Sequence, residues 1–290
     1  MTGTKVVIFH TNYQEYLKNN CEITSKNNEI VIVGDSSVSS LSSMDNVEFV
    51  DYTKYLNHHT IEEFKKYFKP YNTTQEEFVW LWYLRVFITG LFMEDYNLDK
   101  IFHIDSDNIL LSNINELLID EQNGYLISNN FDNPQHMTAS IHSSLLSRNF
   151  FSEFIQLYED LFLNKSKFEL IEKKILFHQE NGGGGICDMT LFYLLNNLDL
   201  INVKNLMLPI KNNVGDEIVF MNDLNDPEGY ESSKQYKENF RGMIKILKNK
   251  DLNKFQIFDE LNRKNIDIAN IHFQGKAKKY LNNRAIKKYS

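Results

Sequence analysis

The sequence predicts an α/β protein built on a mostly parallel sheet flanked by helices. In the first half of the chain, short apolar runs rich in β-branched residues alternate with longer segments that have the apolar periodicity of helices. The predicted strands are Val6–His10, Ile30–Gly34, Val47–Asp51, 101–104 and 125–128. The predicted helices are 13–23, 61–68 and 74–96. Strands separated by helices favour parallel pairing, with helices on both faces of the sheet.

The second half of the chain is expected to be richer in helix. Apolar residues at helical spacing predict helices over 146–163, 168–176, 189–197 and 234–247. The sequence has no internal repeat, no low-complexity tract and only 4 prolines, so no linker divides it. We therefore expect one domain over residues 1–290.

The composition is that of a soluble globular protein. Of 290 residues, 42% are hydrophobic and 24% are charged, and the formal net charge of −8 argues against nucleic acid as the main partner. Cys21 and Cys187 stand far apart, so neither a disulfide framework nor a thiolate zinc site is expected. The first residues lack a signal-peptide pattern, and the apolar segment 78–93 is too short for a membrane span. These features predict a cytoplasmic protein.

The last residues, 276–290, form a basic tail. It holds six basic residues and no acidic one: Lys276, Lys278, Lys279, Arg284, Lys287 and Lys288. Such a tail can make a peripheral contact with an anionic membrane surface. It can equally be a solvated terminus with part of its charge serving a bound anion.

Two carboxylates follow the apolar run 101–104. Asp105 and Asp107 point to the same side if the extended geometry of the strand persists past its end. Two anionic oxygen ligands at one point suit Mn²⁺ or Mg²⁺ with open positions for a phosphate. Ligands of α/β proteins bind at the carboxyl ends of strands. Alternatively, both aspartates cap the turn after the strand.

Arg85 lies inside an apolar helical segment, so its side chain is expected to be largely buried. A buried guanidinium needs an anionic partner. Asp105 or Asp107 could be that partner in a structural salt bridge, and a substrate phosphate could take the same place.

A histidine, a glycine and a lysine stand at regular spacing near the end of the chain: His272, Gly275 and Lys278. Neutral imidazole can join two carboxylates on Mn²⁺. Glycine lets the backbone approach a phosphate, and lysine supplies a compact positive charge. This group would complete the site of the acidic pair.

Four consecutive glycines, 182–185, precede Asp188. They predict a mobile loop, or a loop that approaches a ligand closely. The lysine-serine/threonine ending of a P-loop is absent. Asp188 stands just before an apolar helical run, where it can be a helix N-cap or a catalytic carboxylate.

Polar residues follow the first two predicted strands. Thr11, Asn12 and Tyr13 follow the first, and Asp35 follows the second. Such positions can bind the base and ribose of a nucleotide, or they can be turn and cap residues.

Taken in order, these motifs resemble those of nucleotide-sugar-dependent glycosyltransferases of the GT-A fold, and most of all the retaining enzymes of family 8. The resemblance covers nearly the whole chain. Its most specific elements are Asp105-Ser106-Asp107 and His272-x-x-Gly275-x-x-Lys278, and 11–17, the Arg85 segment and 185–188 add to it. It implies a Rossmann-like GT-A domain, with a nucleotide-binding half over 1–130 and an acceptor-side half over 131–275.

The resemblance also implies a function. The chain is expected to move a hexose from a nucleotide-diphosphate sugar, with UDP as leaving group, to a glycan or lipid-linked saccharide. Asp105, Asp107 and His272 would bind Mn²⁺ (or Mg²⁺). Asp188 would be the catalytic residue, either as a base in an inverting reaction or by positioning the sugar in the retaining reaction typical of the family. The expected donor contacts are Thr11, Asn12, Tyr13, Asp35, Arg85, Ser106, Gly275 and Lys278.

Two other functions remain as alternatives. A haloacid-dehalogenase-like phosphohydrolase also uses Asp-x-Asp after an apolar strand, but normally on an early strand and followed by Thr or Val. Here the pair lies a third of the way along the chain and is followed by Asn108. The other alternative is an inactive binding protein on the same fold, against which the intact Asp105, Asp107, His272 and Lys278 argue.

Overall fold

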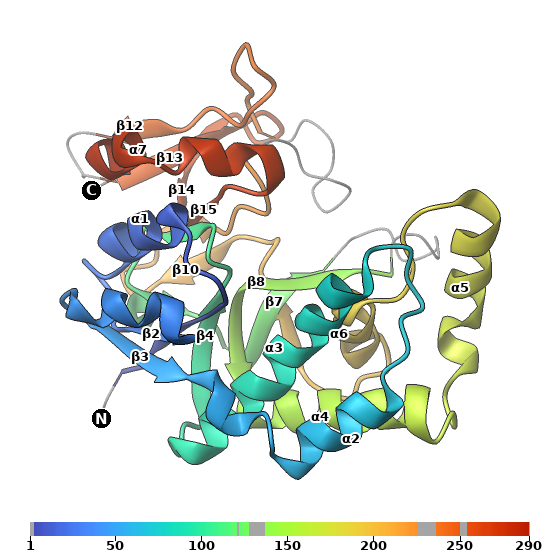
Figure 1. Cartoon of the computed structure of the whole chain (residues 1–290). Coiled ribbons are helices and arrows are strands. Elements are labelled where there is room, and N and C mark those ends of the chain that lie inside the picture. Colours follow the sequence, from blue (N-terminus) through green and yellow to red (C-terminus); the bar gives the residue numbers. More distant parts are fainter. Residues whose placement is uncertain (1–2, 121, 128–136, 225–235, 250–253, 290) are drawn as a thin grey trace.

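A seven-stranded sheet lies at the centre of the computed structural model, which describes residues 3–120, 122–127, 137–224, 236–249 and 254–289. The strand order is β3-β2-β1-β4-β8-β7-β9 (Figure 1). The strands are β1 (Val6–His10), β2 (Ile30–Gly34), β3 (Val47–Asp51), β4 (Lys100–Ile104), β7 (Asn123–Ile127), β8 (Ala139–Ser147) and β9 (Val203–Asn205). Four of the six pairings are parallel, and only those of β8 are antiparallel.

Alternate residues of the central strands enter different cores. Val7 and Val31 pack in the cluster that contains residues of α2, α3, α4 and α6, whereas Val6 and Ile30 pack in a second cluster with α1. The helices are α1 (Glu15–Thr24), α2 (His59–Tyr67), α3 (Glu76–Asp95), α4 (Arg148–Tyr158), α5 (Glu169–Asn181), α6 (Asp188–Asn197) and α7 (Asn283–Tyr289). The period of two in the strands thus produces helices on both faces, and the predicted α/β class is confirmed.

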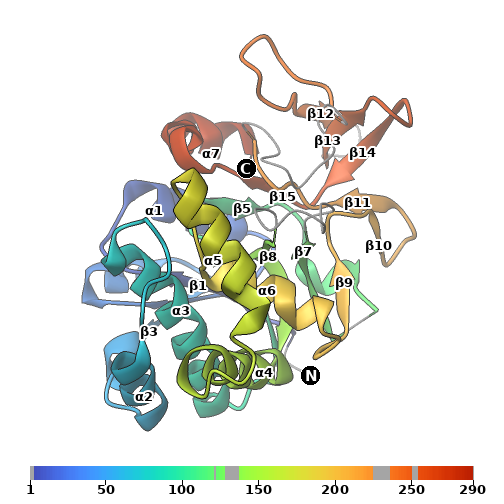
Figure 2. The same cartoon turned by 90° about the vertical axis from the view of Figure 1, so that its right-hand side faces the viewer.

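Two smaller sheets lie above the central sheet (Figure 2). One has the order β12-β13-β14-β11-β10-β6 and the other pairs β15 with β5. Their strands are β5 (Asn108–Leu110), β6 (Leu117–Leu118), β10 (Ile210–Asn212), β11 (Glu217–Val219), β12 (Leu247–Asn249), β13 (Lys254–Asp259), β14 (Lys264–Ile268) and β15 (Asn270–His272). Short helical turns complete the chain: η1 (Ser36–Ser43), η2 (Tyr52–Tyr55), η3 (Ile114–Glu116), η5 (Glu159–Leu163) and η6 (Gly275–Tyr280).

The predictions for the first half of the chain are confirmed to within one or two residues at most ends. Helix α3 is buried on most of its surface, as its apolar sequence predicts. Residue 128, the end of one predicted strand, lies outside the described residues. No helix within the described ranges is long and apolar enough to cross a membrane.

The second half departs from the predictions more often. Helix α5 runs to Asn181, past the predicted end at residue 176, and strands β9–β11 and β13–β15 form where no element was predicted. Residues 146 and 147, predicted as helix, belong to β8, and the helix begins at Arg148. Strand β8 was not predicted because its serines and His142 interrupt the apolar pattern, although all nine of its residues are buried. The predicted helix 234–247 is wrong over its described part, 236–247. In that segment, Glu238 and Ile244 form an antiparallel bridge, and Gly242 between them has a φ of +67°. The chain then enters β12.

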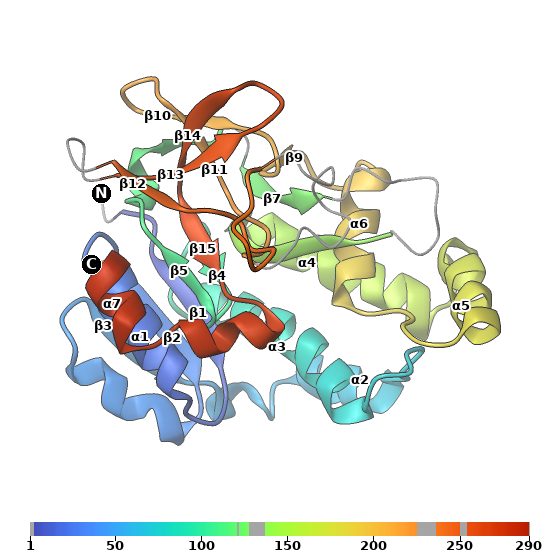
Figure 3. The same ribbon diagram turned by 90° about the horizontal axis from the view of Figure 1, so that it is seen from above.

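Helix in the second half is therefore confined to 148–197 and the end of the chain, and short strands joined by turns form the described residues between. The basic tail is folded. Ala277, Leu281 and Ala285 are buried against the cluster that contains Ile23 of α1, and α7 lies beside α1 (Figures 1 and 3).

Candidate active site

The acidic pair lies in the turn between β4 and β5. The strand ends at Ile104, so the extended geometry does not persist to Asp107. Instead, the backbone N–H of Asn108 donates to the carbonyl of Asp105 at 3.0 Å, which closes a turn. Strand β4 pairs with β1 in the middle of the sheet. The turn therefore stands at the carboxyl edge of the sheet, where α/β proteins bind ligands.

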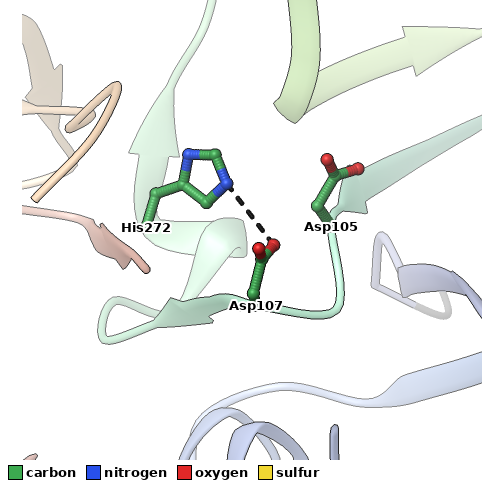
Figure 4. A group of neighbouring side chains, drawn as sticks. All are labelled: Asp105, Asp107 and His272. Atoms are coloured by element: carbon green, nitrogen blue, oxygen red, sulfur yellow. Dashed lines mark ion pairs between the residues drawn. The ribbon is translucent and has the colours of Figure 1, made fainter. Parts of the chain in front are cut away.

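His272 reaches this turn from the far end of the chain. Strand β15 pairs antiparallel with β5, which places His272 opposite Asn108 (Figure 3). Nε2 of His272 then lies 3.4 Å from Oδ1 of Asp107 (Figure 4). The N–H of Phe273 also donates to the carbonyl of Asp107 at 2.8 Å, so backbone and side chain both hold the two segments together.

The tautomer of His272 is fixed by a backbone carbonyl. Nδ1 lies 2.5 Å from the carbonyl oxygen of Asn222. A carbonyl only accepts, so Nδ1 donates and Nε2 of the neutral ring carries the lone pair toward Asp107. The ring of His142 stacks on the other face of this imidazole, with centroids 4.1 Å apart. Burial lowers the pKa of His142 to about 3, so the stacked ring is neutral.

Asp105, Asp107 and His272 fit a divalent cation. One ligand atom from each side chain lies within 4.8 Å of the others. Opposite ligands of a small divalent ion are roughly 4.2 Å apart, so shifts of about half an ångström would let the three share an ion. Carboxylate oxygens with one imidazole are a hard donor set, which suits Mn²⁺ or Mg²⁺ better than a soft metal.

Lys278 meets the same carboxylate from the other side. Its Nζ lies 3.1 Å from Oδ2 of Asp107 and 5.2 Å from the centre of the Tyr16 ring. Partial burial opposes the charged form, but Asp107 outweighs it, and the pKa of Lys278 is raised. The side chain keeps 42% of its surface exposed. A cation therefore faces solvent directly beside the candidate metal ligands.

Arg85 bridges two carboxylates. Its NH1 donates to Oδ1 of Asp105 at 2.9 Å and its NH2 donates to Oδ2 of Asp188 at 2.7 Å. Burial alone would raise the pKa of Asp105, but the Arg85 guanidinium and the neighbouring histidines together outweigh burial and lower it. Of the partners that the sequence left open, the structure thus contains Asp105, and it adds Asp188. Nε of Arg85 is buried without a partner among the described residues.

Asp188 is the first residue of α6 and does not cap it. The cap position belongs to Cys187, so the N-cap interpretation is wrong. Only 3% of the Asp188 side chain is exposed. Burial raises its pKa, while Arg85 acts in the opposite direction. Oδ1 accepts from the N–H of Met189 and Oδ2 accepts from Arg85, so both oxygens are engaged.

The glycine loop before Asp188 is fastened to the segment before α3. The N–H of Ile186 donates to the carbonyl of Tyr71 at 2.7 Å, and that of Thr73 donates to Gly184 at 2.9 Å. Gly185 pairs with Asn72 at φ +141°, and a Cβ there would lie 2.2 Å from the carbonyl oxygen of Tyr71. Close approach of one backbone to another therefore explains this glycine, without a ligand.

The residues after β1 and β2 are tied to each other. The carboxylate of Asp35 accepts from the N–H of Asn12 at 2.7 Å and from that of Ser37 at 2.9 Å. Burial alone would raise the pKa of Asp35, but these hydrogen bonds outweigh it and lower it. The N–H of Tyr13 donates to the hydroxyl of Ser37. Strand β1 lies between β2 and β4 and is parallel to both, so Thr11, Asn12, Tyr13 and Asp35 share the edge that holds the acidic turn.

Two of the residues predicted to bind the donor, Gly275 and Ser106, make no contact among the described residues that indicates a role. Gly275 has φ +54° and open space around its Cβ position, so its backbone is accessible. Ser106 lies in the acidic turn, where its carbonyl accepts from Asn20.

A network of buried asparagines supports the turn, and the sequence gave no indication of it. The amide of Asn20 in α1 donates to the carbonyls of Ser106 and Asn108, both at 3.0 Å. Asn108 donates to the carbonyl of His142 and the hydroxyl of Ser143, and Asn270 donates to the side chain of Asn108. Asn20, Asn108 and Asn270 are all 0% exposed. Asparagine at three buried strand or helix positions is a signal only once burial is known.

No family model and no curated protein matches the chain. Among solved structures, the apo form of mouse xyloside xylosyltransferase 1 is 12% identical with a TM-score of 0.46, over 69% of this chain and 83% of that one. The PaToxG glycosyltransferase is 12% identical with a TM-score of 0.39, over 68% of this chain and 70% of that one. The apo form of the glycosyltransferase GlyE of Streptococcus pneumoniae TIGR4 is 16% identical with a TM-score of 0.38, over 70% of this chain and 45% of that one. These TM-scores lie below 0.5, so the similarities by themselves place the chain in no family.

Proposed function

We propose that the chain is a metal-dependent glycosyltransferase that moves a hexose from a nucleotide-diphosphate sugar, with UDP expected, to a glycan or lipid-linked saccharide. One observation carries this proposal. Asp105, Asp107 and His272 converge at the carboxyl edge of the sheet, and Lys278 meets Asp107 there. A divalent ion next to an accessible lysine is the arrangement that a departing diphosphate requires.

Asp105, Asp107 and His272 would hold Mn²⁺ or Mg²⁺. When bound, the ion supplies positive charge that stabilises the negative charge of the leaving nucleoside diphosphate. The chain contributes the orientation of the ligands, because Asn222 fixes the tautomer of His272 and Arg85 keeps Asp105 ionised.

Lys278 would bind the donor phosphates. An ammonium has three N–H donors, and its one described carboxylate partner is Asp107. The remaining donors can reach a phosphate oxygen without loss of that ion pair. Gly275, three residues earlier, has an accessible backbone that can approach the same group.

Asp188 would position other groups of the site and would not transfer a proton itself. A general base must reach the acceptor hydroxyl, whereas the carboxylate of Asp188 is 3% exposed and each of its oxygens already accepts a hydrogen bond. We infer that Asp188 orients Arg85 and the transferred sugar, as in the retaining reaction expected from the family resemblance. Thr11, Asn12, Tyr13 and Asp35 would line the nucleoside, Ser106 would lie beside the phosphates, and residues 131–275 would face the acceptor in the same domain. A cytoplasmic location stays a prediction of the sequence.

Thermal stability measured with UDP, GDP, CMP and ATP, each with and without Mn²⁺, tests the proposal. Stabilisation by UDP that requires Mn²⁺ is expected. A ligand at 100 times its Kd adds about 2.7 kcal/mol, which is roughly 5 °C at this size. Turnover of phosphomonoesters would instead indicate a phosphohydrolase, and nucleotide binding without release of UDP from any donor would indicate an inactive binding protein. No response to any nucleotide in the presence of Mn²⁺ would refute the proposal.

A further inference from the structure

A basic face surrounds a pocket at the end of the molecule that holds α7. The loop 236–246, between β11 and β12, projects from the body (orange in Figure 2), and α7 lies near its base. The loop, α7 and the segment before α7 enclose a pocket of about 270 Å³. Four cationic side chains line it, two from the loop and two from α7: Arg241, Lys245, Arg284 and Lys288.

The segments that form this face carry mostly positive charge. Residues 236–249 and 275–289 carry ten cationic residues and one acidic residue, Glu238. Lys278 is paired with Asp107, but the four cations of the pocket form no ion pair with any carboxylate in the described parts of the chain. A chain with a net charge of −8 thus gathers four cations around one pocket, and they have no ion-pair partner within the described residues. Such a cluster favours an anionic partner.

The tip of the loop carries an exposed aromatic ring. Phe240 is 93% exposed, and the guanidinium of Arg241 lies 5.1 Å from the centre of its ring. Exposure of a whole phenyl ring to water is unfavourable, and a ring beside cations is typical of side chains that enter the headgroup region of a membrane. A free phosphate would neutralise the cations but would leave Phe240 in water.

The pocket itself has an apolar lining beneath the cations. Met243, Ile246, Phe273 and Tyr280 contribute to it. Such a lining suits a ligand with a charged head and an apolar remainder, such as a phospholipid.

We propose that this face, the loop 236–246 together with α7, docks the protein on a membrane that contains anionic phospholipids. Phe240 enters the headgroup region, and the pocket between the loop and α7 takes a lipid phosphate. The membrane contact is then made by a folded surface that consists of the loop 236–246 and the basic tail. The same segment carries the candidate site, because Phe273 follows His272 and Tyr280 closes the turn that holds Lys278. A docked protein would therefore hold that site close to the membrane.

Co-sedimentation of the full chain with vesicles tests this directly. Vesicles of phosphatidylcholine alone are compared with vesicles that contain an equal amount of phosphatidylglycerol. Binding to the mixed vesicles only is expected. Each cation near an anionic surface contributes about fivefold to partitioning, so the double variant Arg284→Gln/Lys288→Gln should bind roughly 25-fold more weakly. Phe240→Ser should lower binding by about tenfold or more, because the apolar contribution of the ring is lost.

The matched control is Lys66→Gln/Lys173→Gln, which removes two exposed charges from α2 and α5, far from α7 in Figure 1. It should bind like the unaltered protein. Equal loss in the control, equal binding to both vesicle types, or no binding would overturn the inference. So would thermal stabilisation by inorganic phosphate in a protein that does not sediment with vesicles. An acidic protein as the true partner would give the same absence of vesicle binding. The inference does not rest on the proposed function, because a loss of vesicle binding with an intact response to UDP and Mn²⁺ contradicts the docking alone.

Discussion

Nε2 of His272 lies 3.4 Å from Oδ1 of Asp107, although Asp107 lies a third of the way along the chain and His272 lies near its end. The pairing of β15 with β5 brings them together, and the N–H of Phe273 secures it. The candidate metal ligands therefore exist as a set only when the last strands have docked on the turn after β4. Metal binding should then stabilise that docking, because an ion that binds only the folded arrangement adds its binding free energy to folding.

Asp107→Asn should abolish the effect of Mn²⁺. The change keeps the shape of the side chain but removes the charge that both His272 and Lys278 meet. Stabilisation by Mn²⁺ in thermal unfolding should disappear, and the rate of transfer should fall by a factor of the order of 10²–10³. Asp216→Asn, at an exposed carboxylate paired with Lys254, is the control and should respond to Mn²⁺ as before. An undiminished Mn²⁺ response in Asp107→Asn would contradict the assignment of this ligand.

Arg85→Leu should destabilise the protein strongly. It leaves the carboxylates of Asp105 and Asp188 without their shared cation. Loss of one partner of a buried pair costs about 3–5 kcal/mol, which urea unfolding would measure. Lys264→Leu, which breaks an exposed pair with Glu217, should cost less than about 1 kcal/mol.

A second substitution separates charge from packing at this position. Asp188→Asn in the Arg85→Leu background removes one unpaired buried charge. It should recover part of the lost stability, whereas Asp188→Asn alone should lower it. If the double variant is no more stable than Arg85→Leu, the ion pair is not the cause of the loss.

The chemistry of the site could be predicted from sequence to the extent that it is local. Asp105 and Asp107 are separated by one residue and follow an apolar run. His272, Gly275 and Lys278 follow one another at intervals of three residues in one segment. The partner of Arg85 could not be chosen, because it depends on how α6 comes to lie next to β4. Chain spacing carries no information on that contact, so the position of Asp188 beside Arg85 was not predicted.

The fold was predictable where apolar residues alone fill a strand. In β1 and β2 nearly every residue is apolar, and burial follows from composition. In β8 the buried positions include serines and His142. Asn108 donates to the hydroxyl of Ser143 and Nδ1 of His142 meets the hydroxyl of Ser140, whereas Nε2 of His142 has no hydrogen-bond partner among the described residues. From sequence, a buried strand with polar residues looks like an exposed one until its hydrogen-bond partners are known. The asparagine network was missed for the same reason.

Binding of Mn²⁺ should strengthen as the pH rises above 6.5. Burial disfavours the charged form of His272, but its hydrogen bond to Asp107 and the charges of Asp107 and Asp105 together outweigh burial, so its pKa is raised. In the metal-free protein the resulting stability is fully present below pH 6.5 and is lost as the pH rises through the raised pKa. The ion needs the neutral ring, so its affinity grows over the same window. The difference in Tm with and without Mn²⁺ should therefore widen from pH 6 upward.

His272→Gln is the informative variant for this pH effect. It should flatten the dependence of metal-free stability on pH in that window, whereas His59→Gln, at an exposed histidine, should leave it unchanged. A constant Mn²⁺ effect across the window would show that His272 is not the linked group.

Asn270→Ala should destabilise the protein by about 2–4 kcal/mol. The side chain accepts from the N–H of Met221 and donates to Asn108, to Ser143 and to the carbonyl of Met221, all in a fully buried setting. Each buried group left unsatisfied costs about 1–3 kcal/mol. Chemical unfolding is the measurement, with the exposed Asn213→Ala expected within about 0.5 kcal/mol of the unaltered protein. Equal stability of the two variants would mean that water replaces the network.

Gly185→Ala should damage both stability and activity, and Gly183→Ala separates the two possible causes. Both glycines have positive φ, so alanine is strained at either position by roughly 1–3 kcal/mol. Only at Gly185 does the added Cβ meet a backbone atom, the carbonyl oxygen of Tyr71 at 2.2 Å, whereas nothing lies within 4 Å at Gly183. The clash must part the glycine loop from the segment before α3, and Asp188 follows three residues later. Gly185→Ala should therefore unfold at lower urea concentration than Gly183→Ala and should lower kcat, while Gly183→Ala keeps kcat. Equal kcat in both variants would show that the fastening of this loop does not position Asp188.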